Sequence, residues 1–214
     1  MSTGPQYRLA IFDFDGTLAD SFPVFVELFN SLAAKHRYSP VSDEQIVALR
    51  RCGPREVMAA LGMKRWRLPF IVADYRRLAI RHPQVPPLFD HMAESLQRIA
   101  AGGVQLAIVT TNSWDNVVRS LGEETAALFA RAECKVSIFG KHRPLLRVAR
   151  RLGVAPAQTI YFGDQPTDGQ AARRAGMAFG AVAWGYGAPD LMVEQGADHL
   201  LQRPEDIPQL FFTG

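Results

Sequence analysis

The segment YRLAIFDFDGT, Tyr7–Thr17, combines an apolar run with two aspartates and a glycine. Its first half, Tyr7–Phe12, is a short apolar run that predicts a buried strand, and this run breaks at two carboxylates separated by one residue. Gly16 then lets the chain turn. From Phe22 to Lys35 apolar residues recur at helical spacing, so the sequence predicts that a helix follows the first strand.

Farther along the chain, short apolar segments alternate with amphipathic ones. Strands are expected at Val104–Thr110, Lys135–Phe139, Thr159–Phe162, Ala178–Ala183 and His199–Leu201. The intervening helices are expected at 88–101, 114–121, 123–131, 144–152 and 169–175. This alternation favours an α/β fold with a parallel sheet that helices cover on both faces.

One long segment does not fit the alternation. Residues 20–86 contain helical patterns at 22–35, 42–51, 54–61 and 69–81 and no convincing strand. The proline-rich sequence His82–Pro87 then forms a stiff connector. We therefore expect residues 20–86 to be an all-helical insertion into a discontinuous core made of residues 1–19 and 87–214.

Polar side chains follow several of the expected strands directly. The first strand leads to Asp13 and Asp15, and the second leads to Thr110, Thr111 and Asn112. The later segments add Gly140-Lys141, then Gly163-Asp164, with Asp168 four residues on. Ligands of parallel sheets bind beyond the carboxyl ends of the strands, so we expect one pocket to gather these groups.

Four carboxylates in one pocket repel one another unless their pKa values rise or a cation balances them. Carboxylate oxygens with few other donors suit Mg²⁺, which shares its coordination shell with waters and phosphate. Lys141 and the Thr110 hydroxyl would bind other phosphate oxygens. Asp13 and Asp15 diverge once the chain turns, so one of them is free to act as a nucleophile and the other as a proton donor.

These residues carry a resemblance to a known family. Asp13-Phe14-Asp15-Gly16-Thr17, Thr110, Lys141 and the segment Gly163–Asp168 resemble the four motifs of the haloacid dehalogenase-like hydrolases, in the order and at the spacing of that superfamily. Ala171–Met177, Trp184-Gly185-Tyr186 and Ala197-Asp198-His199 resemble its phosphoglycolate phosphatase-like branch. The resemblance covers essentially the whole chain and implies a Rossmann-like parallel sheet flanked by helices, with an inserted all-helical cap domain.

The resemblance also implies a role for each site residue. Asp13 is the nucleophile that forms an aspartyl-phosphate, and Asp15 protonates the leaving oxygen and then activates water. Asp13, the backbone carbonyl of Asp15, and Asp164 hold Mg²⁺, while Asp168 supports the metal's water shell or orients Lys141. The expected phosphate-binding set is Gly16, Thr110, Thr111, Asn112 and Lys141.

The helical insertion carries the candidates for substrate selectivity. Arg50, Arg51 and Arg55 surround a Gly-Pro turn, and an arginine fork binds a carboxylate or a second phosphate. The alternative interpretation, that these arginines lie at a solvated helix end, has equal weight. The Phe and Trp residues of the cap, including Trp66 and Phe70, are expected to serve packing rather than to form a binding platform.

Length and composition exclude several protein classes. The 214 residues are 48% apolar and carry a net charge of only +3, which is weak support for nucleic-acid binding. No apolar run is long enough for a membrane span, and the N-terminus lacks a signal-peptide pattern. Cys52 and Cys134 lack metal-ligand spacing. We expect a cytoplasmic protein without a nucleic-acid or membrane partner, and the oligomeric state is not predicted.

The predicted activity is a Mg²⁺-dependent phosphatase that acts on a small phosphorylated metabolite, phosphoglycolate-like or a sugar phosphate. A phosphomutase on the same core is the first alternative, because nothing in the sequence shows whether water reaches the aspartyl-phosphate. A non-catalytic binding or regulatory protein is the second. That class has no need of both Asp13 and Asp15, which this chain retains.

Overall fold

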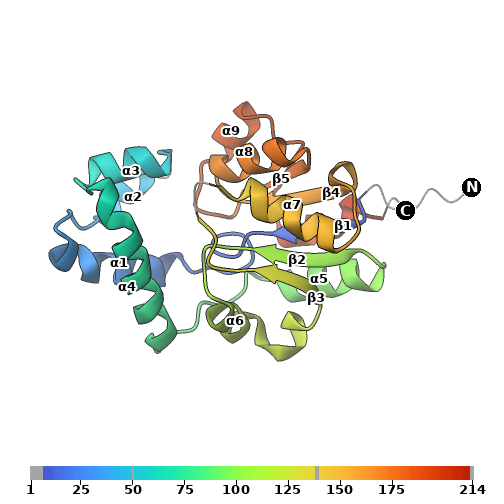
Figure 1. Ribbon diagram of the computed structural model, residues 1–214, viewed down its shortest axis with the longest axis horizontal. Helices are drawn as coiled ribbons and strands as arrows, with labels where there is room; N and C mark the ends of the chain where they lie inside the picture. Colours follow the sequence, from blue (N-terminus) through green and yellow to red (C-terminus); the bar gives the residue numbers. More distant parts are fainter. Residues whose placement is uncertain (1–6, 50, 138–139, 213–214) are drawn as a thin grey trace, which may run out of the picture. The chain divides into compact units, whose positions relative to one another are not determined.

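The computed structural model describes residues 7–49, 51–137 and 140–212, which divide into two compact units (Figure 1). The first unit comprises Met1–Asp20 and Pro87–Gly214, and the second comprises Ser21–Pro86. The second unit is thus an insertion that begins nine residues after the end of the first strand at Phe12.

The first unit is built on one six-stranded sheet in the order β3-β2-β1-β4-β5-β6. Every neighbouring pair of strands is parallel, as the alternating pattern predicts. The strands are β1 (Leu9–Phe12), β2 (Gln105–Val109), β3 (Phe129–Glu133), β4 (Thr159–Gly163), β5 (Ala178–Val182) and β6 (His199–Leu201).

Helices cover both faces of this sheet, as Figure 1 shows. The α-helices of the unit are α5 (Met92–Ala101), α6 (Trp114–Ala126), α7 (His142–Arg151), α8 (Pro166–Ala175) and α9 (Pro189–Glu194), and two 3-10 helices join them, η2 (Pro156–Gln158) and η3 (Pro204–Leu210). One apolar cluster joins a face of the sheet to α5, α6 and η3, and a second joins the opposite face to α7, α8 and α9.

Strand β1 shows how the sequence produces these two layers. Side chains of a strand alternate between faces, and here Ala10 and Phe12 enter the first cluster while Leu9 and Ile11 enter the second. All four are fully buried, which explains why the strand reads as a continuous apolar run.

One strand lies elsewhere than expected. The sequence pattern predicts a helix over 123–131 and a strand at Lys135–Phe139, whereas residues 129–133 form β3 and residues 134–137 are outside any strand. Residues 138–139 lie outside the described residues. Because β3 is an edge strand, it tolerates the charged, half-buried Arg131 and Glu133, which hide its pattern in the sequence.

The second unit is entirely helical in its described residues. Its elements are α1 (Phe22–His36), α2 (Asp43–Leu49), α3 (Pro54–Ala60), the 3-10 helix η1 (Arg65–Arg67) and α4 (Leu68–Arg81). Phe29, Leu32 and Ala33 of α1 form a small core with Leu61 and Ile71. The unit therefore has an apolar core of its own, independent of the sheet.

Two aromatic residues of this unit are not part of that core. Trp66 is 63% exposed and Phe70 is 60% exposed, so the expectation that they serve packing is wrong. Trp66 lies in η1 and Phe70 in the first turn of α4, and α4 turns Ile71 rather than Phe70 toward the core. Residue type alone does not reveal which face of so short an amphipathic segment is buried.

In the described part of the chain, no helix combines the length and the apolar character needed to cross a membrane.

Candidate active site

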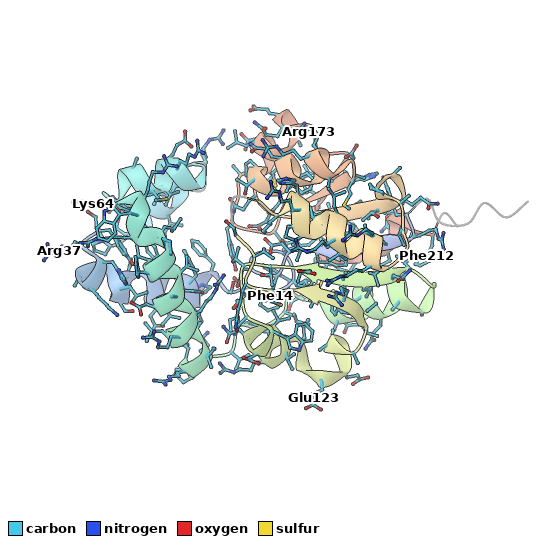
Figure 2. All side chains as sticks on the ribbon, in the orientation of Figure 1. Phe14, Arg37, Lys64, Glu123, Arg173 and Phe212 are labelled. Carbon is cyan, nitrogen blue, oxygen red and sulfur yellow. The ribbon has the colours of Figure 1, made fainter. Side chains whose placement is uncertain are left out.

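The carboxyl ends of β1, β2 and β4 bring the site together. Phe12 pairs with Ile108 on one side and with Phe162 on the other, so the residues that follow these strands emerge at one edge of the sheet. The backbone N–H of Asp13 donates to the Phe162 carbonyl at 2.9 Å, which extends the sheet by one further hydrogen bond. Phe14, labelled in Figure 2, marks the loop that leaves β1.

A buried lysine links two of the aspartates. The Lys141 ammonium, at the start of α7, donates to Asp13 Oδ2 at 2.5 Å and to Asp168 Oδ1 at 2.9 Å. It also contacts the Tyr161 hydroxyl at 3.2 Å, and that hydroxyl donates to Asp168 Oδ1 at 3.0 Å. All four side chains are buried, so the cluster lies in a medium where charge interactions are strong.

Asp164, directly after β4, is held by a different set of groups. Its Oδ2 accepts from the Tyr186 backbone N–H at 2.9 Å and from the Gln165 side-chain amide at 3.1 Å. Gly16 lies so close that a Cβ there would be 2.5 Å from Asp164 Oδ2, and its φ of +76° also favours glycine. The turn after Asp15 therefore has room for no larger residue.

Asp15 faces a different partner. The Asn112 side-chain amide donates to both Asp15 carboxylate oxygens, at 3.3 and 3.1 Å. The orientation of that amide is fixed, because its oxygen accepts from the Ser113 backbone N–H at 2.8 Å and from the Asn116 amide at 2.9 Å. Asp13 and Asp15 thus have separate hydrogen-bond environments although only one residue separates them.

The remaining residues of the expected phosphate-binding set also follow β2. Thr110 is fully buried, and its hydroxyl oxygen accepts from the Asn112 backbone N–H at 3.1 Å. Thr111 is half-buried between them. The structure therefore places Thr110, Thr111 and Asn112 in the loop after β2, with Asn112 directed toward Asp15.

Burial controls the electrostatics of the acidic groups. It raises the pKa of Asp13 to about 8, against the opposing effect of the Lys141 cation. Burial, together with the nearby Asp168 carboxylate, raises the pKa of Asp164 to about 6. For Lys141, burial would lower the pKa, but the Asp13 and Asp168 carboxylates outweigh it and the pKa lies well above the ordinary value.

This arrangement fits a hard divalent cation. Asp13, Asp164 and Asp168 each offer a carboxylate oxygen, and the three oxygens lie within 4.8 Å of one another. Lys141 supplies only one positive charge against these three carboxylates, and the repulsion among the carboxylates adds to the effect of burial in raising the pKa values of Asp13 and Asp164. An all-oxygen donor set with excess negative charge is the type that Mg²⁺ prefers.

Several functional contacts were absent from the sequence-based expectation. Tyr161 gives the clearest example, because it interrupts the apolar strand β4 with a hydroxyl that reaches Lys141 and Asp168. A tyrosine within an otherwise apolar strand is visible in the sequence, and it indicates a buried hydroxyl that needs a hydrogen-bond partner. The Tyr186 backbone N–H and the Asn116 amide leave no comparable signal, because the fold alone brings them to Asp164 and Asn112.

The expected selectivity residues lie in the second unit. Arg51 and Arg55 are exposed, Arg51 before α3 and Arg55 within it. Arg50 lies outside the described residues. Their role as substrate-reading groups stays a prediction.

Comparison with known proteins supplies independent information. The family model of the haloacid dehalogenase-like hydrolases matches residues 10–182. A phosphoglycolate phosphatase of Synechococcus elongatus is 30% identical, over 93% of this chain and 94% of its own length. An N-acetylmuramic acid 6-phosphate phosphatase of Pseudomonas putida is 29% identical, over 94% of this chain and 95% of its own.

Solved structures show the same fold. A haloacid dehalogenase-like family protein from Streptococcus pneumoniae superimposes with a TM-score of 0.78 at 21% identity. The match covers 97% of this chain and 99% of that one, so both units have counterparts in it.

Proposed function

The chain belongs to the haloacid dehalogenase-like hydrolase family, and we propose that it is a Mg²⁺-dependent phosphatase that hydrolyses a small phosphate monoester through an aspartyl-phosphate. The observation that carries this proposal is the buried cluster in which Lys141 contacts both Asp13 and Asp168 while Asp164 lies beside them. A purely structural ion pair needs one carboxylate, whereas transfer of a phosphoryl group needs a nucleophile, a cation and a metal-binding set.

Asp13 is the proposed nucleophile. Its backbone is tied to β4, and its Oδ1 accepts from the Phe14 N–H at 2.8 Å, so the direction of the carboxylate is fixed. In the first step an Asp13 oxygen bonds to phosphorus and the bond between phosphorus and the leaving oxygen breaks. Lys141 holds the nucleophile and offsets the charge of the transferring group.

Asp15 is the proposed proton carrier of both steps. It gives its proton to the leaving oxygen in the first step and takes a proton from the attacking water in the second, which restores Asp13 and releases inorganic phosphate. Asn112 holds both oxygens of Asp15 and so orients the carboxyl group for this exchange. Thr110, with its backbone in the same loop, is the proposed hydroxyl ligand of the phosphoryl oxygens.

The metal set is Asp13, Asp164 and the backbone carbonyl of Asp15. When bound there, Mg²⁺ supplies positive charge that stabilises the phosphoryl group in transit. Asp168 acts through Lys141, to which it is hydrogen-bonded at 2.9 Å.

Two named relatives suggest the substrate class. One is a phosphatase of phosphoglycolate and the other of N-acetylmuramic acid 6-phosphate. Both substrates join a phosphate monoester to a carboxylate-bearing organic part. We propose an acidic phosphorylated metabolite of this type.

The test is the release of inorganic phosphate from a panel of phosphorylated metabolites, with p-nitrophenyl phosphate as a generic substrate. Wild-type protein should release phosphate with Mg²⁺, lose that activity in EDTA and regain it when Mg²⁺ is restored. Full activity in EDTA would exclude the proposed metal set. A phosphomutase would instead isomerise a sugar phosphate while releasing little phosphate, and no turnover of any kind by a folded protein would favour a binding role.

A further inference from the structure

A cavity lies entirely within the helical unit. It has a volume of about 430 Å³ and is lined by the end of α1, by η1 and by residues 70–77 of α4. This volume is in the range of small-molecule sites in proteins. None of its lining residues belongs to the site at the sheet edge.

Two exposed aromatic rings form part of this cavity. Trp66 and Phe70 meet edge to face, with ring centroids 6.5 Å apart and planes at 78°. At 63% and 60% exposure, they leave a large apolar surface in water. Adjacent exposed rings of this size are typical of a binding surface rather than of a solvated helix.

The rest of the lining is rich in cations. Lys35, Arg67 and Arg77 line the cavity, against the single carboxylate of Asp74. Asp74 already accepts from Lys35 at 2.6 Å and lies 3.4 Å from Arg77, so one negative charge is shared between two cations. The cavity therefore retains a positive charge that favours an anion.

Arg67 contributes in a second way. Its guanidinium lies 4.9 Å from the centroid of the Trp66 ring and donates to the His36 carbonyl at 2.5 Å. Its Nε is buried and has no hydrogen-bond partner among the described residues. The stacked guanidinium thus fixes the indole in place as one wall of the cavity.

The charge of the whole unit points the same way. Residues 21–86 contain eleven lysine and arginine residues and five acidic residues, whereas the remainder of the chain contains thirteen and sixteen. Lys64 and Arg37, both labelled in Figure 2, adjoin the lining segments in sequence. An anion that approaches this unit therefore experiences a favourable potential.

We propose that this cavity binds a small organic anion that carries a planar ring, the combination of features found in a nucleoside phosphate. The ring packs against Trp66 and Phe70, and the anionic group pairs with Lys35 and Arg77. The site is separate from the phosphate chemistry at the sheet edge, so it requires no activity of that site.

The test uses AMP as the probe, titrated by calorimetry in the Asp13→Asn background without Mg²⁺, so that the probe is not consumed. Trp66→Ala should weaken AMP binding about tenfold, as expected for loss of base stacking. Arg77→Ala should weaken it about fivefold, and this loss should shrink in high salt. Trp66→Tyr, which keeps a ring, should retain most of the affinity, and Arg81→Ala, an exposed arginine of α4 outside the lining, should leave it unchanged.

Two further measurements complete the test: the binding of compounds that lack one part of AMP, and the oligomeric state of the protein. Adenosine, which lacks the charge, and inorganic phosphate, which lacks the ring, should each bind at least tenfold more weakly at the Trp66-dependent site. Equal AMP affinity in all variants, or no AMP binding, overturns the proposal. It is also overturned if a short oligonucleotide binds tighter than AMP, or if sedimentation shows a dimer that Trp66→Ala dissociates, because the rings then serve RNA or a second copy of this chain.

Discussion

At the scale of single residues, a few hydrogen bonds give each aspartate of the site a different environment. Asp13 contacts a buried ammonium, Asp15 contacts an amide, and Asp164 contacts a backbone N–H. Three chemically identical carboxylates therefore acquire different properties from their neighbours alone. Tyr161 belongs to this level, because its hydroxyl joins Lys141 to Asp168 without carrying charge.

Tyr161→Phe tests that assignment. The ring still fills its space in β4, but Lys141 and Asp168 each lose a hydrogen-bond partner, so the ammonium is held less firmly against Asp13. We expect kcat to fall about tenfold, with KM changed little, in steady-state phosphate release.

The matched control is Tyr7→Phe. It removes another largely buried tyrosine hydroxyl, one that is hydrogen-bonded to His199 at 3.1 Å. It should alter stability without altering kcat. Wild-type kcat in Tyr161→Phe would show that Lys141 needs no help from this hydroxyl.

At the scale of elements, the sequence predicts strands well where both faces are buried and poorly at an edge. β1 and β4 are completely buried, and their apolar runs locate them to within two residues. β3 has one buried residue in five, and its half-buried Arg131 and Glu133 form ion pairs, so its sequence resembles that of a helix. Pairing with β2 determines the extended conformation of residues 129–133, and the local sequence pattern does not indicate that pairing.

The contact between α1 and α4 yields a prediction about stability. Asp74 of α4 accepts from Lys35 Nζ at 2.6 Å and His36 Nε2 at 2.9 Å, and the hydrogen bond from Lys35 is the main reason why the pKa of Asp74 is lowered. A carboxyl group whose pKa is lower in the folded state stabilises that state above its unfolded pKa, and loses the effect as pH falls through the folded pKa. Asp74→Asn should therefore lower Tm at pH 7, and the difference from wild type should begin to shrink below about pH 4 and shrink further as the pH falls.

Thermal unfolding of both proteins between pH 3 and pH 8, roughly the span over which carboxyl groups titrate, measures this effect. Glu27→Gln is the control, because Glu27 is a highly exposed carboxylate of α1 whose ion pair with His82 is 3.3 Å long. It should change Tm little at any pH. A Tm difference for Asp74→Asn that stays constant into acid would show that the carboxylate charge does not stabilise the α1 and α4 pair.

At the scale of the whole molecule, the sequence predicts which groups gather but not how they contact one another. Strand ends locate Asp13, Thr110 and Asp164 because a parallel sheet has only one carboxyl edge. The contact between Lys141 and Asp168 depends on where α7 and α8 begin relative to the sheet, and no spacing in the sequence specifies that; only the family resemblance offered it, as one of two roles for Asp168. The same limit applies to Trp66 and Phe70, whose exposure follows from the packing of a separate unit.

The division into two units predicts that catalysis and substrate selectivity reside in different units. Phosphate chemistry at the sheet edge is indifferent to the organic part of a substrate, so we propose that the inserted unit supplies selectivity through Arg50, Arg51 or Arg55. Alanine at the arginine that reads the substrate should lower kcat/KM for the preferred substrate ten- to a hundredfold, about 1.4–2.7 kcal/mol. The value for p-nitrophenyl phosphate should change much less.

Arg81→Ala, another exposed arginine of the inserted unit, is the control and should leave both substrates unaffected. Equal losses on both substrates in the Arg50, Arg51 and Arg55 variants, or none on either, would place selectivity elsewhere in the chain.

The proposed mechanism requires that Asp13 becomes covalently phosphorylated, and chemical trapping detects that intermediate. Borohydride reduces an acyl phosphate of aspartate to homoserine, which peptide mass spectrometry locates in the chain. With substrate and Mg²⁺, wild-type protein should acquire homoserine at position 13, whereas Asp13→Asn, and wild-type protein without substrate, should acquire none. Phosphatase turnover with no homoserine at position 13, or with the reduced residue at Asp15 instead, would show that Asp13 is not the nucleophile.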